Sequence, residues 1–412
     1  MTIPRSRDLR LLAGAAGLSA LGDFLALLPL VLHVQQHTAS AFAVSAVFFA
    51  LWAPLVLGAG FAGAIADRVE NRGLLAGVSF AQAAVVIAIA LSVDSLWTLL
   101  PLLAVLGFGV AVSQPAEFAL VPAAAGSADV TRANGLMETA RSLGFTAGPL
   151  VGGALGAAGL LHLALAIDAV SFVVVGVAAL LLRARRRPAR GGPGAARVRA
   201  RDGIAYLLAD RSLAITLGGA VAALTIFTMS ATAEPFFVTD VLGAGSLGYG
   251  LLITAWTLGM AAGAAGVAHR VATAGVAAAA SAAIVVQGLG IAGAAVAPVL
   301  GVALLGFALG GVAHGVKNVL LRTLIHERVP DALRGRAFAA YNGARNGAEL
   351  GALALGGLVV GAFGARAALL ASGLGPAAIG VACLLLLLTT TRRRAAAAPG
   401  LDGRTLHVHV QN

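Results

Sequence analysis

The chain has 412 residues, of which 59% are hydrophobic and only 11% charged, and it carries a formal net charge of +11. A mean hydropathy of +0.94 excludes an ordinary soluble globular domain. Its single cysteine, Cys383, excludes an internal disulfide and a cysteine-based metal cluster.

Runs of roughly 20 apolar residues fill the chain almost end to end. A helix of about 20 residues, rising 1.5 Å per residue, crosses the roughly 30 Å hydrocarbon core of a membrane. The runs therefore predict an all-α membrane protein with twelve transmembrane helices, at residues 10–34, 42–66, 73–93, 96–118, 136–158, 160–182, 212–237, 247–268, 273–296, 299–321, 338–362 and 366–389.

Arginines fall almost entirely in alternate gaps between these spans. The gaps that follow the first, third and later odd-numbered spans contain one arginine, Arg366. The other gaps and the two ends contain most of the rest, with a concentration between residues 183 and 201. Basic loops are retained in the cytoplasm during insertion, so both termini and the central gap are predicted to be cytosolic. The same arginines are expected to contact anionic lipid headgroups.

Two other interpretations fit less well. Basic proteins that bind nucleic acid interleave aromatic residues with their charges, whereas here aromatics are 5% of the chain and nearly all lie within the spans, so no nucleic-acid partner is expected. The first apolar run is longer than the core of about 7 to 15 residues of a signal peptide, and eleven spans follow it. It is predicted to be the first transmembrane helix.

A segment rich in Gly, Pro and Arg divides the spans six and six and is predicted to be a flexible cytosolic linker. The predicted organisation is an N-terminal bundle (1–182), a linker (183–211), a C-terminal bundle (212–391) and a cytosolic tail (392–412).

The two halves are weakly similar to each other. An offset of 204 residues aligns Arg132 with Arg336 and Arg141 with Arg345, and an offset of 202 aligns Arg68 with Arg270. Parallel repeats with a central site between them are typical of secondary transporters.

Several motifs carry a resemblance to a known family. The most specific follows the second span and reads Gly63-x-x-x-Asp67-Arg68-x-x-Asn71-Arg72. It resembles the glycine, acid and base loop of the major facilitator superfamily. The span 136–158 contains Gly144-x-x-x-Gly148-Pro149-x-x-Gly152-Gly153, which is similar to the glycine-proline motif of exporters. Ser19, Gly22 and Asp23 in the first span, and Pro115, Ala116, Ala119, Leu120, Pro122, Ala133 and Asn134 around the fourth, also resemble the drug:proton antiporter branch, with its enterobactin-exporter and macrolide-efflux-like members.

The sequence departs from that pattern at several positions. Glu70 and Asn71 replace a glycine and a base, Glu117 stands where the branch often has a base, and His269 replaces the acid of the second-half loop. The resemblance implies the fold and proton-coupled export by alternating access, but it does not imply a substrate.

Two carboxylates lie near the middle of predicted spans, Asp23 and Glu349. An ionised carboxylate there costs roughly 2.5 to 3.5 kcal/mol, so each must be protonated, paired or in contact with water. A proton-coupled transporter needs a carboxyl group that alternates between such states. Asp23 could instead only position its helix by hydrogen bonds. Arg345 lies one turn from Glu349 on the same face, so these two could equally form a permanent ion pair.

The loop residues Gly63, Asp67, Arg68 and Arg72 resemble a cytosolic latch between the halves, in which Asp67 caps the end of the span 338–362. A simple loop turn is the alternative. Arg141 is expected to act in gating and to pair with Glu138 or Asp67. Small faces let helices approach closely, so Gly144, Gly148 and Gly152 are predicted to pack against Gly259, Gly263 and Gly266 of the span 247–268.

Other polar residues within spans are candidates for a cavity lining. Lys317 is the only lysine in the chain, and its long stem could instead carry the ammonium to the cytosolic interface. His314 could titrate near neutral pH. Gln114, Asp168 and Gln287 complete the candidates, and Glu234 is a weaker one.

These observations exclude most enzyme classes. The chain lacks a phosphate-binding loop of the Gly-x-x-x-x-Gly-Lys type, and its sequence shows no metal-ligand spacing, so no cofactor and no metal site are expected. We expect a monomeric proton-coupled exporter of a small amphipathic molecule (a drug, siderophore or secondary metabolite) in a prokaryotic cytoplasmic membrane. A proton-coupled importer and a membrane sensor without transport activity remain alternatives, while a channel would not explain the two repeated halves.

Overall fold

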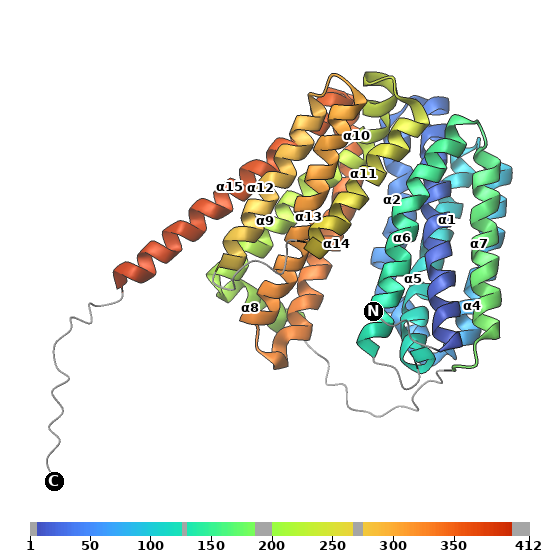
Figure 1. Cartoon of the computed structure of the whole chain (residues 1–412), viewed down its shortest axis with the longest axis horizontal. Coiled ribbons are helices and arrows are strands. Elements are labelled where there is room, and N and C mark those ends of the chain that lie inside the picture. Colours follow the sequence, from blue (N-terminus) through green and yellow to red (C-terminus); the bar gives the residue numbers. More distant parts are fainter. Residues whose placement is uncertain (1–5, 126–129, 186–199, 267–274, 398–412) are drawn as a thin grey trace, which may run out of the picture.

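The computed structural model describes the chain except for residues 1–5, 126–129, 186–199, 267–274 and 398–412, and the described part is built from helices (Figure 1). The first half contains α1 (Arg7–Thr38), α2 (Ala41–Leu57), α3 (Ala59–Arg68), α4 (Asn71–Ser92), α5 (Leu96–Ala125), α6 (Val130–Ala157) and α7 (Leu161–Leu181). The second half contains α8 (Ala200–Ala209), α9 (Arg211–Thr228), α10 (Ser230–Phe236), the π-helical turn η1 (Phe237–Val241), α11 (Gly245–Gly266), α12 (Val276–Ala295), α13 (Leu300–Arg328), α14 (Asp331–Phe363) and α15 (Ala365–Ala397).

Within the described residues, ten helical segments are long and apolar enough to cross a membrane, and α2 with α3 forms an eleventh span bent by 52°. The bend follows Pro54 and lies at Gly58, whose amide donates to the carbonyl of Pro54. Helix α6 is the remaining predicted span. Its glycines, Glu138 and Arg141 make it less apolar than the others, but its 28 residues correspond to about 42 Å of helix, packed between α1 and α11. We assign it as the twelfth.

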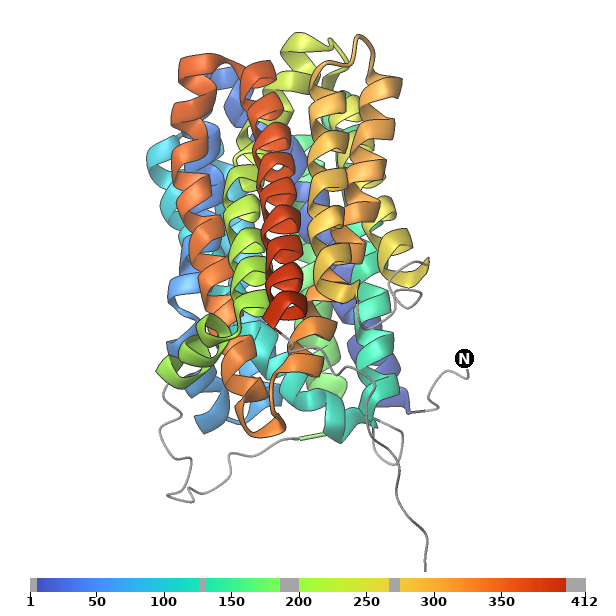
Figure 2. The same cartoon turned by 90° about the vertical axis from the view of Figure 1, so that its left-hand side faces the viewer.

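The predicted spans agree with the observed helices, which extend further at the ends that carry arginine. One feature of the predicted linker is different: residues 200–209 form the helix α8, which packs against α14 and α9 (Figure 2). The hydroxyl of Tyr206 donates to the carbonyl of Arg328, 2.9 Å away, and thereby ties α8 to the end of α13.

The outward-facing surface of the helices is apolar. Leu57, Leu91 and Trp97 are 76%, 85% and 91% exposed. Apolar surface on this scale is what a protein presents to lipid rather than to water. This surface, together with the spans, establishes a multi-pass membrane protein.

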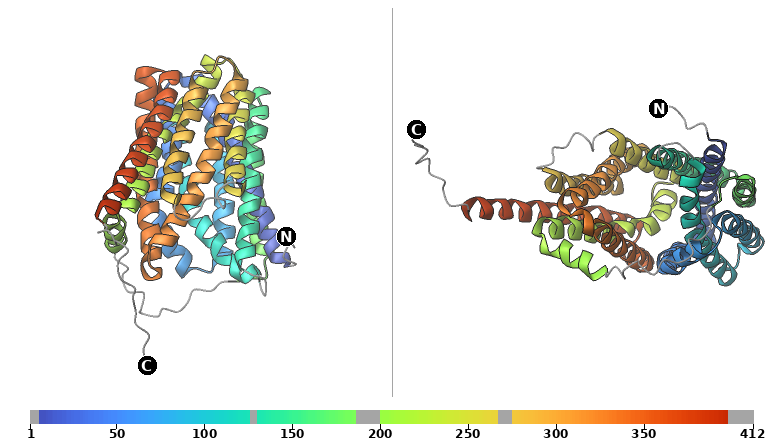
Figure 3. Two further views of the ribbon diagram at one scale, coloured as in Figure 1. Left: turned by 60° about the vertical axis from the view of Figure 1, so that its left-hand side comes forward. Right: turned by 90° about the horizontal axis from the view of Figure 1, so that it is seen from below.

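The two ends of the molecule differ in how the halves meet (Figures 1 and 3). We call the end with the start of α1, α8 and the end of α13 the arginine-rich end, and the opposite end the arginine-poor end. At the arginine-poor end one apolar core is shared, because Leu28 and Leu32 of α1 pack with Phe237 and Tyr249 of the other half. At the arginine-rich end each half has its own core, around Leu120 in the first and in a separate cluster in the second.

Hydrogen bonds between the halves follow the same distribution. Among the described residues, such bonds include those from Gln35 to Thr239 and Asp240, from Ser45 to the carbonyl of Leu353, and from Thr254 to the carbonyl of Thr146. These contacts lie at the arginine-poor end or near the middle of the bundle. The molecule is therefore closed at its arginine-poor end.

The predicted crossing of the span 136–158 with the span 247–268 is present, as α6 against α11, but the predicted glycine pairs are wrong. A Cβ at Gly144 or Gly148 would meet the backbone of α1, and a Cβ at Gly263 would lie 2.0 Å from a carbonyl of α13. The crossing itself uses Gly153 and Gly250. A helix presents several faces, and Gly153 lies about 100° around α6 from Gly152.

This crossing gives a first prediction. In Gly250→Val the new Cβ would lie 2.4 Å from the carbonyl oxygen of Pro149. We therefore expect the closed conformation to be destabilised by roughly 1–3 kcal/mol. The thermal midpoint should fall, and a cysteine at Ser246, in a Cys383→Ser background, should react faster with a polar thiol reagent. Gly293→Val is the control, because a Cβ at Gly293 meets open space. If Gly250→Val and Gly293→Val had the same thermal midpoint and the same thiol reactivity, the assignment of Gly250 to the crossing of α6 and α11 would be contradicted.

Candidate functional site

Two cavities adjoin each other in the middle of the molecule, and Phe24, Leu27 and Trp52 contribute to both. The larger has a volume of about 530 Å³ and is lined mainly by α1, α2, α4, α5, α6 and α7, with Met260 and Arg345 from the second half. The smaller, of about 280 Å³, is lined by both halves. The larger volume is within the range of roughly 300 to 1,000 Å³ found for small-molecule sites.

A cluster of charged residues lines the larger cavity, and we call it the acidic cluster: Asp23 of α1, Glu117 of α5, Arg141 of α6 and Asp168 of α7. The guanidinium of Arg141 lies 2.5 Å from Glu117, and each of these side chains is only 12% exposed. The same guanidinium lies 4.7 Å above the ring of Phe118, in a cation–π contact. Asp23 is close enough to interact electrostatically with both.

Helix packing brings the fourth member to the cluster. Gly22 lies directly against Asp168 and Ser171, because a Cβ there would be 2.6 Å from the nearest oxygen of each. Asp168 is 3% exposed and interacts electrostatically with Asp23. Glu117 and Asp23 therefore lie near the guanidinium of Arg141, and Asp168 lies beside Asp23. The cluster has three carboxyl groups and one cation, so it has more sites for protons than cations to balance them.

The second half contributes a different set of polar groups. Two nitrogens of Arg345 lie 3.1 and 3.2 Å from the same carboxylate oxygen of Glu349, so the two residues form an ion pair along one face of α14. Arg345 lines the larger cavity and Glu349 the smaller one. The pair thus lies at the boundary between the two cavities.

The side chain of Lys317 does not extend to the cytosolic interface of the membrane, which was the alternative to a place near the cavity. It is 3% exposed, and its ammonium donates to Gln287 of α12 at 2.8 Å and lies 3.3 Å from the ring of His314. His314 lines the smaller cavity, whereas Lys317 and Gln287 lie behind it within the second half. Of the remaining candidates, Gln114 and Asp168 line the larger cavity.

Aromatic side chains dominate the smaller cavity. Phe24, Trp52, Phe227, Tyr249 and Trp256 all contribute, and the rings of Phe227 and Trp256 stack with centroids 5.0 Å apart. One further carboxyl group in this lining is Glu234, which accepts a hydrogen bond of 2.8 Å from Ser230. The cavity therefore offers a largely apolar surface with a few charged groups.

The structure corrects one predicted pairing. Arg141 was expected to contact Glu138 or Asp67, but its partner is Glu117, which sequence reasoning noted only as a departure from a family pattern. An acidic residue inside an apolar span is itself a signal for a buried partner. That signal, applied to Glu117, would have identified it as a site residue.

The residues of the predicted latch lie at the arginine-rich end. Gly63 and Asp67 belong to α3, which packs on α5 and α2, and a Cβ at Gly63 would meet open space. Arg72 of α4 donates to the carbonyl of Leu180, so it braces α4 against α7. Arg68 ends α3. The second-half counterpart of this loop, with His269, lies outside the described residues.

Solved structures with the same fold support this architecture. The nucleoside transporter NupG is 14% identical to this chain, with a TM-score of 0.75 over 92% of this chain and 99% of its own. The POT family transporter PepTSo is 12% identical, with a TM-score of 0.73 over 95% and 99%. A bacterial homolog of the human lysosomal transporter Spinster, in an inward-facing and unoccupied conformation, is 14% identical, with a TM-score of 0.66 over 94% and 96%.

At these identities the similarity shows the fold alone, and no curated protein matches the chain. The model of the Major Facilitator Superfamily, however, matches residues 12–348 of the 412. This range includes every member of the acidic cluster and Arg345. The chain belongs to the Major Facilitator Superfamily, and it is a secondary transporter rather than an enzyme.

Proposed function

We propose that this transporter exports a small amphipathic molecule in exchange for protons, from the cytosol of a prokaryote across its cytoplasmic membrane. The observation that carries the proposal is the acidic cluster beside an aromatic cavity. The larger cavity holds three carboxyl groups and one guanidinium of the same half, and aromatic side chains are seven of the twenty residues that line the smaller cavity. A carboxyl-rich wall can bind and release protons, and an aromatic wall suits an amphipathic ligand.

The orientation of the molecule in the membrane is supported by the arginines at one of its ends. Arginine-rich loops favour a cytosolic position for the end at which each half has its own core. The shared core then closes the outer end, which is one of the two conformations of an alternating-access cycle. Export as the direction of transport rests on the resemblance of Gly144, Gly148, Pro149, Gly152 and Gly153 to the exporter motif. We place both termini in the cytosol and propose that the chain functions as a monomer.

A reconstitution experiment tests the proposal. In vesicles containing the protein with its arginine-rich end outward, an acidic interior should accelerate uptake of members of a diverse panel of small amphipathic compounds, measured by mass spectrometry. A proton ionophore should remove the acceleration, and vesicles without protein provide the baseline. Uptake that needs an acidic exterior would indicate an importer. A substrate flux that is the same with and without the proton gradient would contradict proton coupling.

A further inference from the structure

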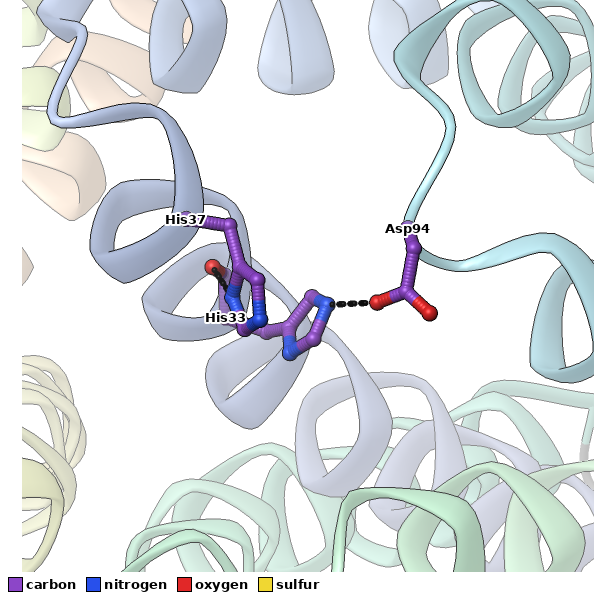
Figure 4. Close-up of side chains that lie close together, drawn as sticks. All are labelled: His33, His37 and Asp94. Atoms are coloured by element: carbon purple, nitrogen blue, oxygen red, sulfur yellow. Dashed lines mark hydrogen bonds and ion pairs between the residues drawn. The ribbon is translucent and has the colours of Figure 1, made fainter.

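At the arginine-poor end, two histidines and an aspartate lie close together. Figure 4 shows the three side chains. His33 and His37 lie in the last two turns of α1, and Asp94 lies in the loop between α4 and α5. One ring nitrogen from each histidine and one carboxylate oxygen lie within 4.8 Å of one another. The two histidines are four residues apart, a spacing that suits a metal site, but the sequence gives no sign of the third ligand, because Asp94 is 61 residues from His33 in the chain. None of the three lines either cavity.

The orientation of His37 is typical of a metal ligand. Its Nδ1 lies 2.9 Å from the carbonyl oxygen of His33, so the Nδ1–H donates there and the lone pair of Nε2 is free. Histidines that bind metals usually donate their second ring nitrogen to a carbonyl or carboxylate in this way. The i, i+4 spacing places both rings on one face of α1, with centroids 3.8 Å apart.

The distances are also compatible with a shared ion. Ligand atoms at about 2.0–2.2 Å from a tetrahedral Zn²⁺ are separated by roughly 3.3 Å. Nε2 of His33 already lies 3.0 Å from an oxygen of Asp94. The side chain of Asp94 is 79% exposed, so it is free to adjust to an ion at little cost in packing. His162, at the start of α7, is close enough to interact electrostatically with His33.

We propose that His33, His37 and Asp94 bind one divalent transition-metal ion of the zinc class, with water at the remaining position. Two imidazoles and a carboxylate suit Zn²⁺, Ni²⁺ or Cu²⁺ rather than Ca²⁺ or Mg²⁺, which prefer a shell of oxygens. The site is independent of the proposed transport function, since it requires neither a substrate nor a proton gradient.

A bound ion would connect the end of α1 to the loop before α5. Between the two histidines lies Gln35, whose amide donates to Thr239 at 2.6 Å and to Asp240 at 3.2 Å in the other half. The ion would therefore order the turn of α1 that holds the halves together at this end. Because the ion binds the folded chain, it should also raise the thermal midpoint.

Direct titration tests the site. The full chain, without an affinity tag, is placed in nanodiscs with His407→Gln and His409→Gln, because these tail histidines could chelate metal themselves. Calorimetry with Zn²⁺ should show one ion per chain, and Co²⁺ should give the visible absorption bands of a low-coordinate site. His37→Asn and Asp94→Asn should each weaken Zn²⁺ binding by roughly 10–100-fold or more.

His326→Asn is the matched control, since His326 lies near the end of α13 at the arginine-rich end. It should bind Zn²⁺ as the parent does. Asp94 is exposed, so Asp94→Asn should elute as a single folded peak and separate loss of the site from loss of the fold. Identical isotherms for the parent, His37→Asn and Asp94→Asn would overturn the proposal. So would an absence of saturable binding by the parent.

Discussion

Replacing Glu349 with glutamine, or Asp23 with asparagine, should abolish proton-driven accumulation while leaving exchange of substrate down its own gradient. Either amide mimics a carboxyl group that is permanently protonated, so the step that needs the ionised form would be lost. Both carboxyl groups line the cavities, Asp23 the larger and Glu349 the smaller. Each can therefore respond to a proton that enters with the solvent.

The measurement is accumulation in reconstituted vesicles as a function of pH, scored beside counterflow exchange and the yield of folded protein. Asp331→Asn is a suitable control, because it removes a carboxylate that is 88% exposed and lines neither cavity. If only one cavity variant loses accumulation, that residue is the proton carrier. Retention of accumulation by both would contradict the assignment.

The exposure of Arg345 determines how Glu349→Gln affects folding. Removing Glu349 would lower the yield of folded protein if it left Arg345 as a buried, uncompensated charge. The Arg345 side chain is 37% exposed and lines the larger cavity, so water screens it. We now expect only a modest effect of Glu349→Gln on folded yield, and the main effect on transport.

The largest effect on stability is expected at Arg141. Arg141→Leu removes the one cation of the acidic cluster and leaves Glu117 and Asp23 without their counter-charge. Breaking a buried ion pair by removing one partner costs about 3–5 kcal/mol, and both side chains of this pair are 12% exposed. Glu117→Gln should be milder, because Asp23 remains close enough to interact with Arg141.

Thermal unfolding of the purified variants tests this order, together with the double variant Glu117→Gln/Arg141→Leu to extract the coupling between the pair. Arg345→Leu is the matched control, since Arg345 occupies the equivalent position in the second half but is 37% exposed. The thermal midpoint of Arg345→Leu should fall less than that of Arg141→Leu. Equal shifts for the two arginines would show that burial of the Glu117–Arg141 pair is not what stabilises the bundle.

Features that depend on one helix at a time could be predicted from the sequence. The spans follow from local hydropathy, because the thickness of the hydrocarbon core sets the length of each apolar run. The concentration of arginines in alternate loops can also be read from the sequence, because it depends only on where each arginine lies relative to the spans. Arg345 and Glu349 face each other because residues four apart share one side of a helix. The apolar runs and motifs were therefore enough for the fold and the family.

Features that depend on how helices face one another were decided by tertiary structure. The sequence offered Glu138 and Asp67 as partners of Arg141, and only the packing of α6 against α5 brings Glu117 to it. Gly144 and Gly153 belong to one motif but serve different neighbours, since successive positions point in different directions around α6. Likewise, no local pattern indicates which end is closed, or that Asp94 meets the histidines of α1. The hydropathy pattern sets the depth of a residue in the membrane. The partner of that residue depends on the rotation of each helix about its own axis, and this rotation is determined by the packing of the whole bundle.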